Sequence, residues 1–407
     1  WSPREALDLY ECIEWAAAQP WCDGKVGLLG ISYYAMNQWY AASLRPPHLS
    51  AMCVWEGAAD YYRDVARHGG IYCDFIGRWF TRQVASVQHG VGDKGPRSRV
   101  TGEAVSGPET SSEADLALRR VDPTTEILGR PLDDEYYRER SPRYGSITTP
   151  LLSAANWGGQ CLHPRGNFEG YLEAASEQKW LEVHGGNHFF GFYSDRGVAL
   201  QKRFFGHFLK GDDTGWRKQP PVELQIRNVD GRFTSRPEAE WPLARTRWEA
   251  FYLASDDLSL RARPTAGDDI EYDTTGNGVT FLSAPFERMT EITGPVAARL
   301  FLSSDTHDAD VFVVLQLFDP DGREVVFDGS DDPRTPLGLG WLRASHRKLD
   351  VEKSRPYRPF HTHDEEMPLE PGRPVQLDIE IWPTCIVVPT GYRIGLMIRG
   401  RDYENGC

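Results

Sequence analysis

The sequence predicts an α/β domain built on a parallel sheet, followed by an all-β domain. Three observations support this fold class. Residues 1–243 alternate short apolar strands with amphipathic helices, which is typical of βα units around a parallel sheet. Residues 244–407 carry many short alternating segments separated by turn signals, which is typical of a β-sandwich or jelly roll. A polar, turn-rich stretch at about 60–146 interrupts the first pattern and predicts a mostly helical cap inserted over the sheet.

The elements of the first domain follow from hydrophobic periodicity. Apolar residues share one face of residues 3–19, which predicts a helix, and the runs "LSAMCVWEG" and "TPLLSAANW" have the apolar character of strands buried on both faces. Only one helix precedes the first strand, so we expect the N-terminal strands of this sheet to be missing and the chain to be truncated at both ends. The expected strands are 26–29, 49–57, 149–157 and 179–186, and the later helices begin at 33, 167 and 195.

Composition excludes several classes of function. The formal charge of −14 disfavours nucleic acid as a partner, and no apolar run approaches the ~18 residues of a membrane span. The seven cysteines are odd in number, widely spaced and without a CxxC pair, so we expect free thiols rather than a disulfide framework or a zinc site. A reducing, cytoplasmic location is the corresponding expectation. A homo-oligomer remains open.

Ser32 stands in the stretch "KVGLLGISYYAMNQWYAAS", between a predicted strand and a predicted helix. In α/β-hydrolases the nucleophilic serine lies on such a strand-to-helix turn, with small residues around it. Gly30 fits the position two before the serine, but Tyr34 stands where the motif has its second glycine. A helix N-cap serine is the alternative interpretation.

The partners of the serine are expected in the chain order serine, acid, histidine, with the histidine just past a strand and before the last helix of the sheet domain. His188, in "LEVHGGNHFF", has this position and can return to the serine from its loop. His184 lies within the predicted strand and is interpreted as a packed core histidine.

The motifs together resemble the X-Pro dipeptidyl-peptidase and cocaine esterase family of serine hydrolases. The resemblance covers "WCDGKVGLLGISYYAMNQW", "PLLSAANW", "WLEVHGGNH" and the "WEAFYL" that opens the β domain. It implies an α/β-hydrolase domain with a helical cap, a C-terminal jelly roll and hydrolysis of esters or amides. The family motif G-x-S-Y-x-G matches 30–35 with Ala35 as its last residue, and the family histidine matches His188.

The triad acid is where the sequence departs from the family. The resemblance places an aspartate two residues after Trp157, but Gly159 stands there. Glu56 ends the preceding predicted strand, at the sheet edge where functional groups gather, and is our first candidate for the acid. Asp60 is the second candidate, and a structural Glu56 without any triad acid is the third interpretation.

The mechanism that follows is acyl transfer through an acyl-enzyme on Ser32, with His188 as base and the Tyr33 N–H as oxyanion donor. Tyr33 and Tyr34 are candidates for lining an acyl pocket. The resemblance implies a second oxyanion donor, a tyrosine hydroxyl, upstream of residue 1. The substrate is a small ester, an amide or a peptide, and no cofactor is expected.

Other constellations are given ordinary structural interpretations. The run "HTHDEE" at 361–366 is expected to be a solvated loop rather than a metal site, and no metal is predicted. "DPDG" at 319–322 predicts a hairpin turn. Cys161 and His163 lack an orienting carboxylate in register and are not interpreted as a thiol nucleophile and its base.

Two other functions remain open at this stage. The first is a catalytically impaired hydrolase scaffold that binds a ligand or partner, its triad incomplete at Gly159. A carboxylate within reach of the His188 ring separates this interpretation from an active hydrolase. The second, a carbohydrate-binding β-sandwich, depends only on fold analogy.

Overall fold

Six strands form the first sheet of the computed structural model, which describes residues 1–403. The order is β1-β2-β5-β6-β7-β8, and β1 to β7 pair in parallel. The last strand, β8, pairs antiparallel with β7, so the sheet is mixed rather than purely parallel. The strands are β1 (Val26–Ile31), β2 (Leu49–Trp55), β5 (Leu151–Asn156), β6 (Lys179–His184), β7 (Val222–Arg227) and β8 (Phe233–Glu238).

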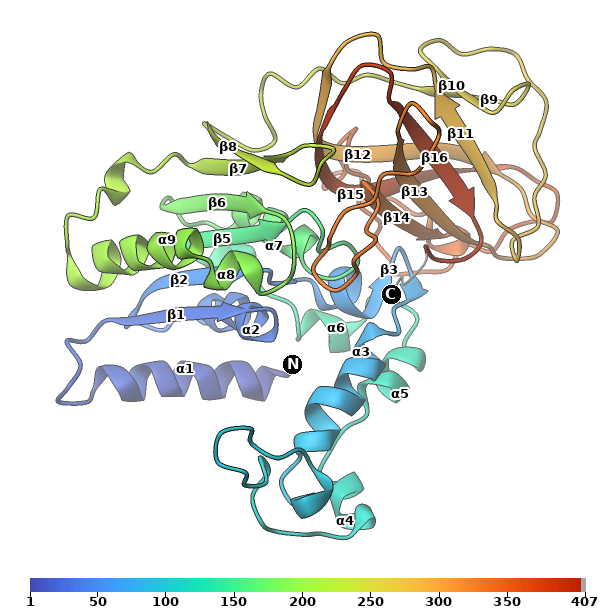
Figure 1. Cartoon of the computed structure of the whole chain (residues 1–407). Coiled ribbons are helices and arrows are strands. Elements are labelled where there is room, and N and C mark those ends of the chain that lie inside the picture. The colour runs from blue at the N-terminus through green and yellow to red at the C-terminus, as the bar shows by residue number, and fades with distance from the viewer. Residues whose placement is uncertain (404–407) are drawn as a thin grey trace.

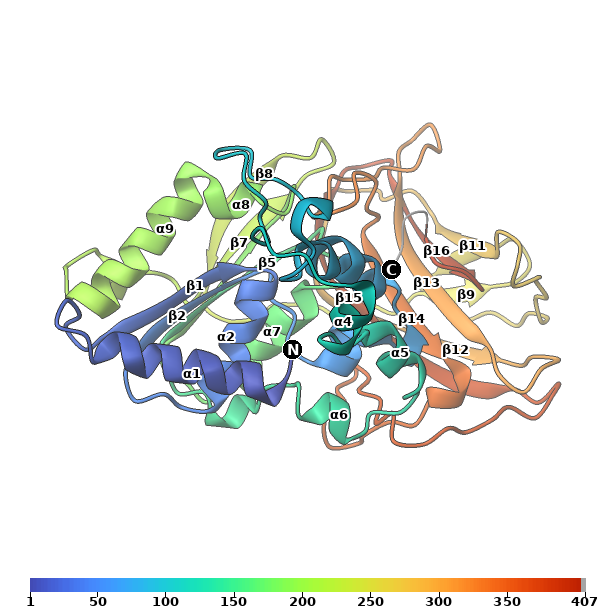
Figure 2. The ribbon, with the colours of Figure 1, turned by 90° about the horizontal axis from the view of Figure 1, so that it is seen from below.

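Helices cover both faces of this sheet (Figures 1 and 2). Met52 and Val54 of β2 face the side of α1 and α2, while Cys53 and Trp55 face the side of α9. Because successive strand residues point to opposite faces, this double burial explains why β2 has no polar face. The helices are α1 (Pro3–Ala17), α2 (Tyr33–Ser43), α7 (Pro164–Glu173), α8 (Phe190–Tyr193) and α9 (Asp195–Phe205), with the turns η6 (Gly206–Lys210) and η7 (Trp216–Lys218) after them.

The inserted segment between β2 and β5 is built of short helices, as the sequence predicts. In Figure 1 its central part extends below both sheets. None of the helices in residues 1–403 is long and apolar enough to cross a membrane. The elements of the insertion are η1 (Tyr61–Ala66), β3 (Arg67–His68), β4 (Ile71–Tyr72), α3 (Phe75–Trp79), η2 (Phe80–Val84), η3 (Ala85–Val87), η4 (Gly92–Lys94), α4 (Glu113–Leu118), α5 (Pro123–Leu128), α6 (Glu135–Arg138) and η5 (Tyr144–Ser146).

Eight strands form the second sheet, in the order β12-β15-β14-β13-β16-β11-β10-β9. All pairs are antiparallel except β10 with β11, which the sequence pattern did not predict. The predicted turn at 319–322 is present, with the Gly322 N–H donating to the Asp319 carbonyl over 3.0 Å. The elements are β9 (Tyr252–Ala254), β10 (Ser259–Arg261), β11 (Val279–Ser283), β12 (Thr290–Leu302), β13 (Asp310–Phe318), β14 (Gly338–Arg343), η8 (Ala344–His346), β15 (Val375–Val388) and β16 (Arg393–Arg399).

Within residues 1–403 the cysteines follow the expectation of free thiols with one exception. Cys12, Cys22, Cys53, Cys73 and Cys385 are free. Cys161 is disulfide-bonded, which corrects the expectation for that residue. Cys407 lies outside the described residues.

Buried ion pairs join the α/β domain to the β domain. Arg165, the second residue of α7, contacts Asp64 of the insertion at 2.9 Å and Glu380 of β15 at 3.0 Å. Arg63 donates to the backbone carbonyls of His361 and Thr362 over 2.9 and 3.2 Å. Because removing one partner of a buried ion pair leaves a costly unpaired charge, these contacts fix how the two domains sit against each other.

Four buried histidines lie at the same interface: His68, His346, His361 and His363. The "HTHDEE" run was expected to be solvated, and this was wrong for its histidines, because Arg63 and the insertion cover them. Nδ1 of His346 lies 3.1 Å from Nδ1 of His363. Burial lowers the pKa of His68, His346 and His361 to about 4 each, and the pKa of His363 falls well below its usual range for the same reason.

These lowered pKa values predict a loss of stability in mild acid. A histidine whose folded pKa lies below its unfolded value of 6.5 contributes stability that is present above pH 6.5 and is lost as the pH falls toward about 4. Replacing His361 with Gln should therefore flatten the pH dependence of the free energy of unfolding between pH 6.5 and 4.5 by up to about 1.4 kcal/mol per pH unit. Urea titrations of both proteins across this range measure the difference, and parallel curves would contradict the prediction.

Candidate active site

Ser32 occupies a strained turn at the C-terminal end of β1. Its backbone has φ 58° and ψ −120°, a conformation that non-glycine residues rarely adopt. The hydroxyl makes no capping hydrogen bond to α2, so the alternative of a simple N-cap serine is wrong. Instead Oγ lies 3.1 Å from Nε2 of His163. Strain of this kind persists only where the surrounding structure enforces it, and it is concentrated at functional sites.

Gly30 makes this turn possible through its lack of a side chain. A Cβ at this position would lie 2.5 Å from Cβ of Tyr34 and 2.7 Å from its carbonyl oxygen. The glycine of the motif is therefore required by the close approach of α2 to β1. Tyr34 itself can stand where the motif has its second glycine because its side chain points outward and is 72% exposed.

Glu56 lies at the C-terminal end of β2, the strand next to Ser32. It also has a positive φ of 45°, and its side chain is fully buried. Four donors surround the carboxylate. Oε1 accepts from Nε2 of His184 and from Nδ2 of Asn156, each over 3.1 Å. Oε2 accepts from Nδ1 of His188 over 2.8 Å and from Oγ of Ser330 over 2.7 Å.

This environment keeps Glu56 ionised. Burial disfavours the charged carboxylate, but the hydrogen bonds from His184 and His188 outweigh that effect and lower the pKa of Glu56. The same carboxylate raises the pKa of His188 against the opposing effect of burial. The carboxylate that we sought near the His188 ring is therefore present, and it is Glu56. Asp60, the second candidate, is paired with Arg63 at 2.9 Å.

Ser330 reaches this site from the β domain. Besides donating to Glu56, it accepts a hydrogen bond from the His188 N–H at its carbonyl oxygen over 3.1 Å, and its own N–H donates to the Gly158 carbonyl over 3.0 Å. A Cβ at Gly158 would lie 2.5 Å from Cα of Gly329, so the β-domain loop packs directly on the loop after β5. The sequence offers no signal for this contact, because Glu56 and Ser330 are 274 residues apart.

His163 is the residue that sequence reasoning missed. It lies directly before α7, in the loop after β5, and its ring stacks on that of His188 with centroids 5.0 Å apart. Its Nδ1 makes no hydrogen bond and lies 4.0 Å from Oε2 of Glu56. Burial, followed by repulsion from His188, lowers the pKa of His163 to about 3, so the ring is neutral at neutral pH. The one feature of the sequence that could have indicated His163 is its position as a polar residue shortly after the end of a predicted strand.

The two tyrosines after Ser32 differ from each other. Tyr33 begins α2, where a backbone N–H has no intrahelical acceptor. Its hydroxyl donates to Glu5, and its ring packs against Trp1 and Trp79. Burial, followed by the Glu5 hydrogen bond, raises the pKa of Tyr33. The Tyr33 side chain is therefore held by packing contacts, whereas the Tyr34 side chain is exposed.

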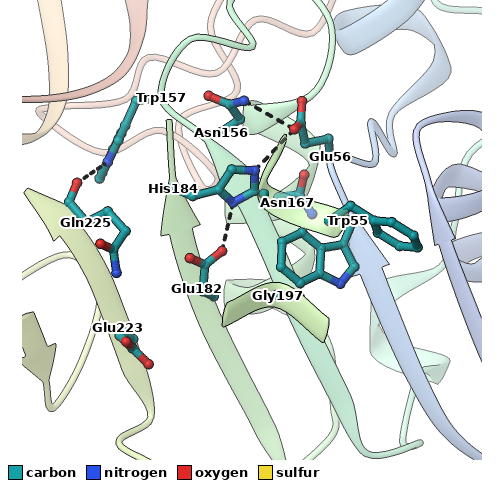
Figure 3. Close-up of polar contacts among 12 residues, drawn as sticks. Trp55, Glu56, Asn156, Trp157, Asn167, Glu182, His184, Gly197, Glu223 and Gln225 are labelled. Carbon is teal, nitrogen blue, oxygen red and sulfur yellow. Dashed lines mark hydrogen bonds and ion pairs between the residues drawn. The ribbon is translucent and has the colours of Figure 1, made fainter. Parts of the chain in front are cut away.

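His184 lies between two buried carboxylates behind the site (Figure 3). Its Nδ1 is 2.8 Å from Oε2 of Glu182, and its Nε2 faces Glu56. Burial opposes a charged ring, but Glu182 and Glu56 outweigh it and raise the pKa of His184 to about 9. The interpretation of His184 as a core histidine was correct about its burial. It did not foresee the contacts with Glu182 and Glu56.

The ligand atoms of Glu56, His163 and His188 lie within 4.8 Å of one another, the spacing of a possible metal site. Hydrogen bonds from His188 and Ser330 already occupy Oε2 of Glu56. A metal ion would have to replace the proton between His188 and Glu56. The arrangement therefore suits a charge-assisted hydrogen-bond network better than metal coordination.

The strained turn at Ser32, the sheet and the loop of His188 are features of an α/β-hydrolase fold, and comparisons with known proteins agree. The family model of the X-Pro dipeptidyl-peptidase (S15 family) matches residues 1–190, and that of the X-Pro dipeptidyl-peptidase C-terminal non-catalytic domain matches residues 214–406. A CocE/NonD family hydrolase from Staphylococcus aureus superposes with a TM-score of 0.88 at 33% identity, over 100% of this chain and 70% of that one.

Two curated relatives extend the comparison. A candidate serine esterase of Mycobacterium bovis is 27% identical over 99% of this chain and 75% of its own length. The cocaine esterase of a Rhodococcus strain is 23% identical over 98% of this chain and 77% of its own. The chain therefore belongs to the CocE/NonD family of hydrolases, and it is an enzyme of the S15-related serine hydrolase and esterase class.

The tight packing at Gly30 generates a prediction about stability. Gly30→Ala should lower the free energy of unfolding by about 1–3 kcal/mol, because the new Cβ must displace α2 from β1. The matched control is Gly145→Ala, where a Cβ meets nothing within 4 Å and the change should stay under about 1 kcal/mol. Urea unfolding measures both variants, and equal effects would contradict the steric account.

Proposed function

We propose that the enzyme hydrolyses small esters, or amides of similar size, through an acyl-enzyme on Ser32, with His188 as general base and Glu56 as the acid that orients it. The observation that carries this proposal is the 2.8 Å contact between Nδ1 of His188 and Oε2 of Glu56, beside the strained turn of Ser32. A base oriented by a buried carboxylate is the arrangement that serine activation requires.

The base function is assigned to His188 rather than to His163 on electrostatic grounds. The Nδ1–H of His188 donates to Glu56, so its Nε2 carries the lone pair that a general base needs, and the carboxylate stabilises the imidazolium that forms. His163 touches Ser32 but has no hydrogen bond at Nδ1 and a lowered pKa. It is therefore a poor proton acceptor and a good holder of the resting hydroxyl.

The reaction then proceeds in two half-reactions. Oγ of Ser32 turns from His163 toward His188, loses its proton to Nε2 of His188 and attacks the carbonyl carbon. His188 returns that proton to the leaving alcohol or amine as the acyl bond to the leaving group breaks. Water then attacks the acyl-serine and gives a proton to Nε2 of His188, and His188 returns that proton to Oγ of Ser32 as the acyl–Oγ bond breaks and the carboxylic acid leaves.

The developing oxyanion requires donors that are already in place. The N–H of Tyr33 is the donor that this chain offers, because it is the first N–H of α2 and is adjacent to the nucleophile. The alternative of an impaired scaffold was raised because Gly159 stands at the expected position of the acid. The four hydrogen bonds received by Glu56 support the active enzyme instead.

Fluorophosphonate labelling tests the nucleophile and the acid together. Wild-type protein should be labelled at Ser32, and Ser32→Ala should lose the label. Glu56→Gln should slow labelling by several orders of magnitude, because an amide cannot stabilise the His188 imidazolium. Peptide mapping by mass spectrometry locates the adduct.

Each outcome has a distinct meaning. Labelling at Ser32 that is unaffected by Glu56→Gln would keep the enzyme and discard Glu56 as the acid. No labelling of folded wild-type protein would overturn the proposal in favour of the binding scaffold. Asp60→Asn is the matched control, since Asp60 pairs with Arg63 and should leave the labelling rate within about threefold of wild type.

The contact from the β domain generates a separate prediction. Ser330→Ala removes a donor to the carboxylate of Glu56 and should lower kcat/KM for a chromogenic ester about ten- to hundredfold, the effect of losing one hydrogen bond to a charged group. Ser303→Ala, at an exposed serine of the same domain, should leave kcat/KM unchanged. Equal kinetics for the two variants would show that Ser330 does not assist the acid.

A further inference from the structure

Two buried carboxylates, those of Glu182 and Glu56, flank the ring of His184 at the C-terminal end of the first sheet. Glu182 and His184 share β6 and lie two residues apart on the same face, while Glu56 comes from the end of β2 (Figure 3). Both carboxylates and the ring are buried, with side-chain exposures of 2%, 0% and 5% for Glu182, Glu56 and His184. Trp55 packs against the ring at 5.3 Å between centroids.

Donors other than His184 already contact both carboxylates. Three donors besides His184 reach Glu56: Asn156 on Oε1, and His188 and Ser330 on Oε2. Glu182 accepts from Nη1 of Arg196 over 2.6 Å on its other oxygen. Each nitrogen of His184 therefore faces an oxygen of a carboxylate that another donor already contacts.

The protonation state of His184 follows from these contacts. A neutral imidazole has one N–H and one lone pair, so one of its nitrogens would direct a lone pair at a buried anion. Only the doubly protonated ring supplies a donor to both carboxylates. We infer that His184 is an imidazolium at neutral pH that clamps Oε1 of Glu56 and thereby directs Oε2 toward His188, which makes His184 a positioning residue for the general base.

This inference rests on the proposed function, because it gives His184 a role through the acid and base of that mechanism. A buried anion with two competing histidines needs its orientation fixed: Oε2 of Glu56 is 2.8 Å from His188 and 4.0 Å from Nδ1 of His163. Fastening Oε1 from behind limits rotation of the carboxylate. Arg196 extends the clamp to the surface, where it also contacts Glu223 at 3.0 Å.

The charges around His184 define what its removal does to the pH profile. Facing it are Glu182 on its own strand, Glu56 after β2, and, beyond these, Arg196 of α9 and Glu223 of β7. Across Glu56 lie His188 and His163, and Asp331 acts on His188 from the β domain. His184 is the cation that opposes protonation of His188, while Glu56 and Asp331 favour it.

The charge state is measured directly by nitrogen-15 NMR of the histidine-labelled enzyme. At pH 7 both ring nitrogens of His184 should show an attached proton, and this double protonation should persist until the pH approaches 9. Assignment comes from the signal that His184→Gln removes. A single N–H on His184 at pH 7 would overturn the inference, whether or not the protein hydrolyses esters, so this failure is distinct from failure of the proposed function.

The positioning role is measured by the pH profile of ester hydrolysis. His184→Gln should lower kcat about ten- to hundredfold with little change in KM, because the substrate does not touch this residue. The acid limb of kcat/KM should move to higher pH, since the His188 imidazolium loses a repelling cation while Ser330 and Asn156 still hold Glu56 ionised. His207→Gln, at a histidine of η6 outside the network around Glu56, should leave kcat and the acid limb unchanged.

If His184→Gln does not fold, the variant Glu182→Gln provides a second test. Glu182→Gln keeps both histidines and replaces one anionic partner with a neutral amide, so the pKa of His184 should fall and its titration should become visible nearer neutrality. If the titration of His184 were unchanged in Glu182→Gln, the inference that His184 clamps Glu56 would be overturned. A folded His184→Gln variant with wild-type kcat and an unshifted acid limb would do the same.

Discussion

The hydrogen bonding of Glu56 is the constraint on which the site depends. A fully buried carboxylate is unfavourable unless it is paired and its oxygens are satisfied. Here the donors come from β5, β6, the loop after β6 and the β domain, so the folding of four separate parts of the chain converges on one side chain. The buried Glu56 carboxylate stays satisfied only if these four parts of the chain hold their relative positions. Domain packing is therefore linked to the chemistry proposed for Ser32.

The β domain is therefore more than a cover for the active site. The loop that carries Ser330 packs on the loop after β5 and bonds to both Glu56 and the backbone of His188. The family description of this domain as non-catalytic remains apt in the sense that it supplies no reacting group. Its contribution is to fill the last acceptor position of Glu56 and to fix the loop on which His188 stands. The buried ion pairs of Arg165 hold the interface in which this loop is fixed.

The sequence was sufficient for the parts of the site that depend on local structure. The turn at Ser32, the strand end at Glu56 and the loop position of His188 all follow from short patterns, because a parallel sheet places its functional groups at the C-terminal ends of its strands. The strands β1, β2, β5 and β6, the helical insertion and the second β-rich domain follow from periodicity in the same way. The antiparallel β8 and the parallel pair of β10 and β11 do not, since strand direction is set by loop closure rather than by composition.

The remaining contacts depend on distances that no local pattern encodes. His163 reaches Ser32 across 131 residues and Ser330 reaches Glu56 across 274, and neither has a motif of its own. The histidines of the "HTHDEE" run illustrate the same limit, because their burial is caused by Arg63 and the insertion rather than by their polar neighbours.

His184 shows most clearly why the sequence could not settle the electrostatics of the site. The alternation "WLEVH" places Glu182 and His184 on one face of β6, and a reader of the sequence reasonably assigns both to packing. What changes their meaning is the second carboxylate brought against the ring by β2, two strands away in the sheet. A histidine with one carboxylate neighbour can remain a neutral donor, whereas a histidine whose two ring nitrogens each face a carboxylate must donate from both. The charge of this residue is thus a property of the tertiary structure, and it arises from the same requirement to satisfy Glu56 that organises the rest of the site.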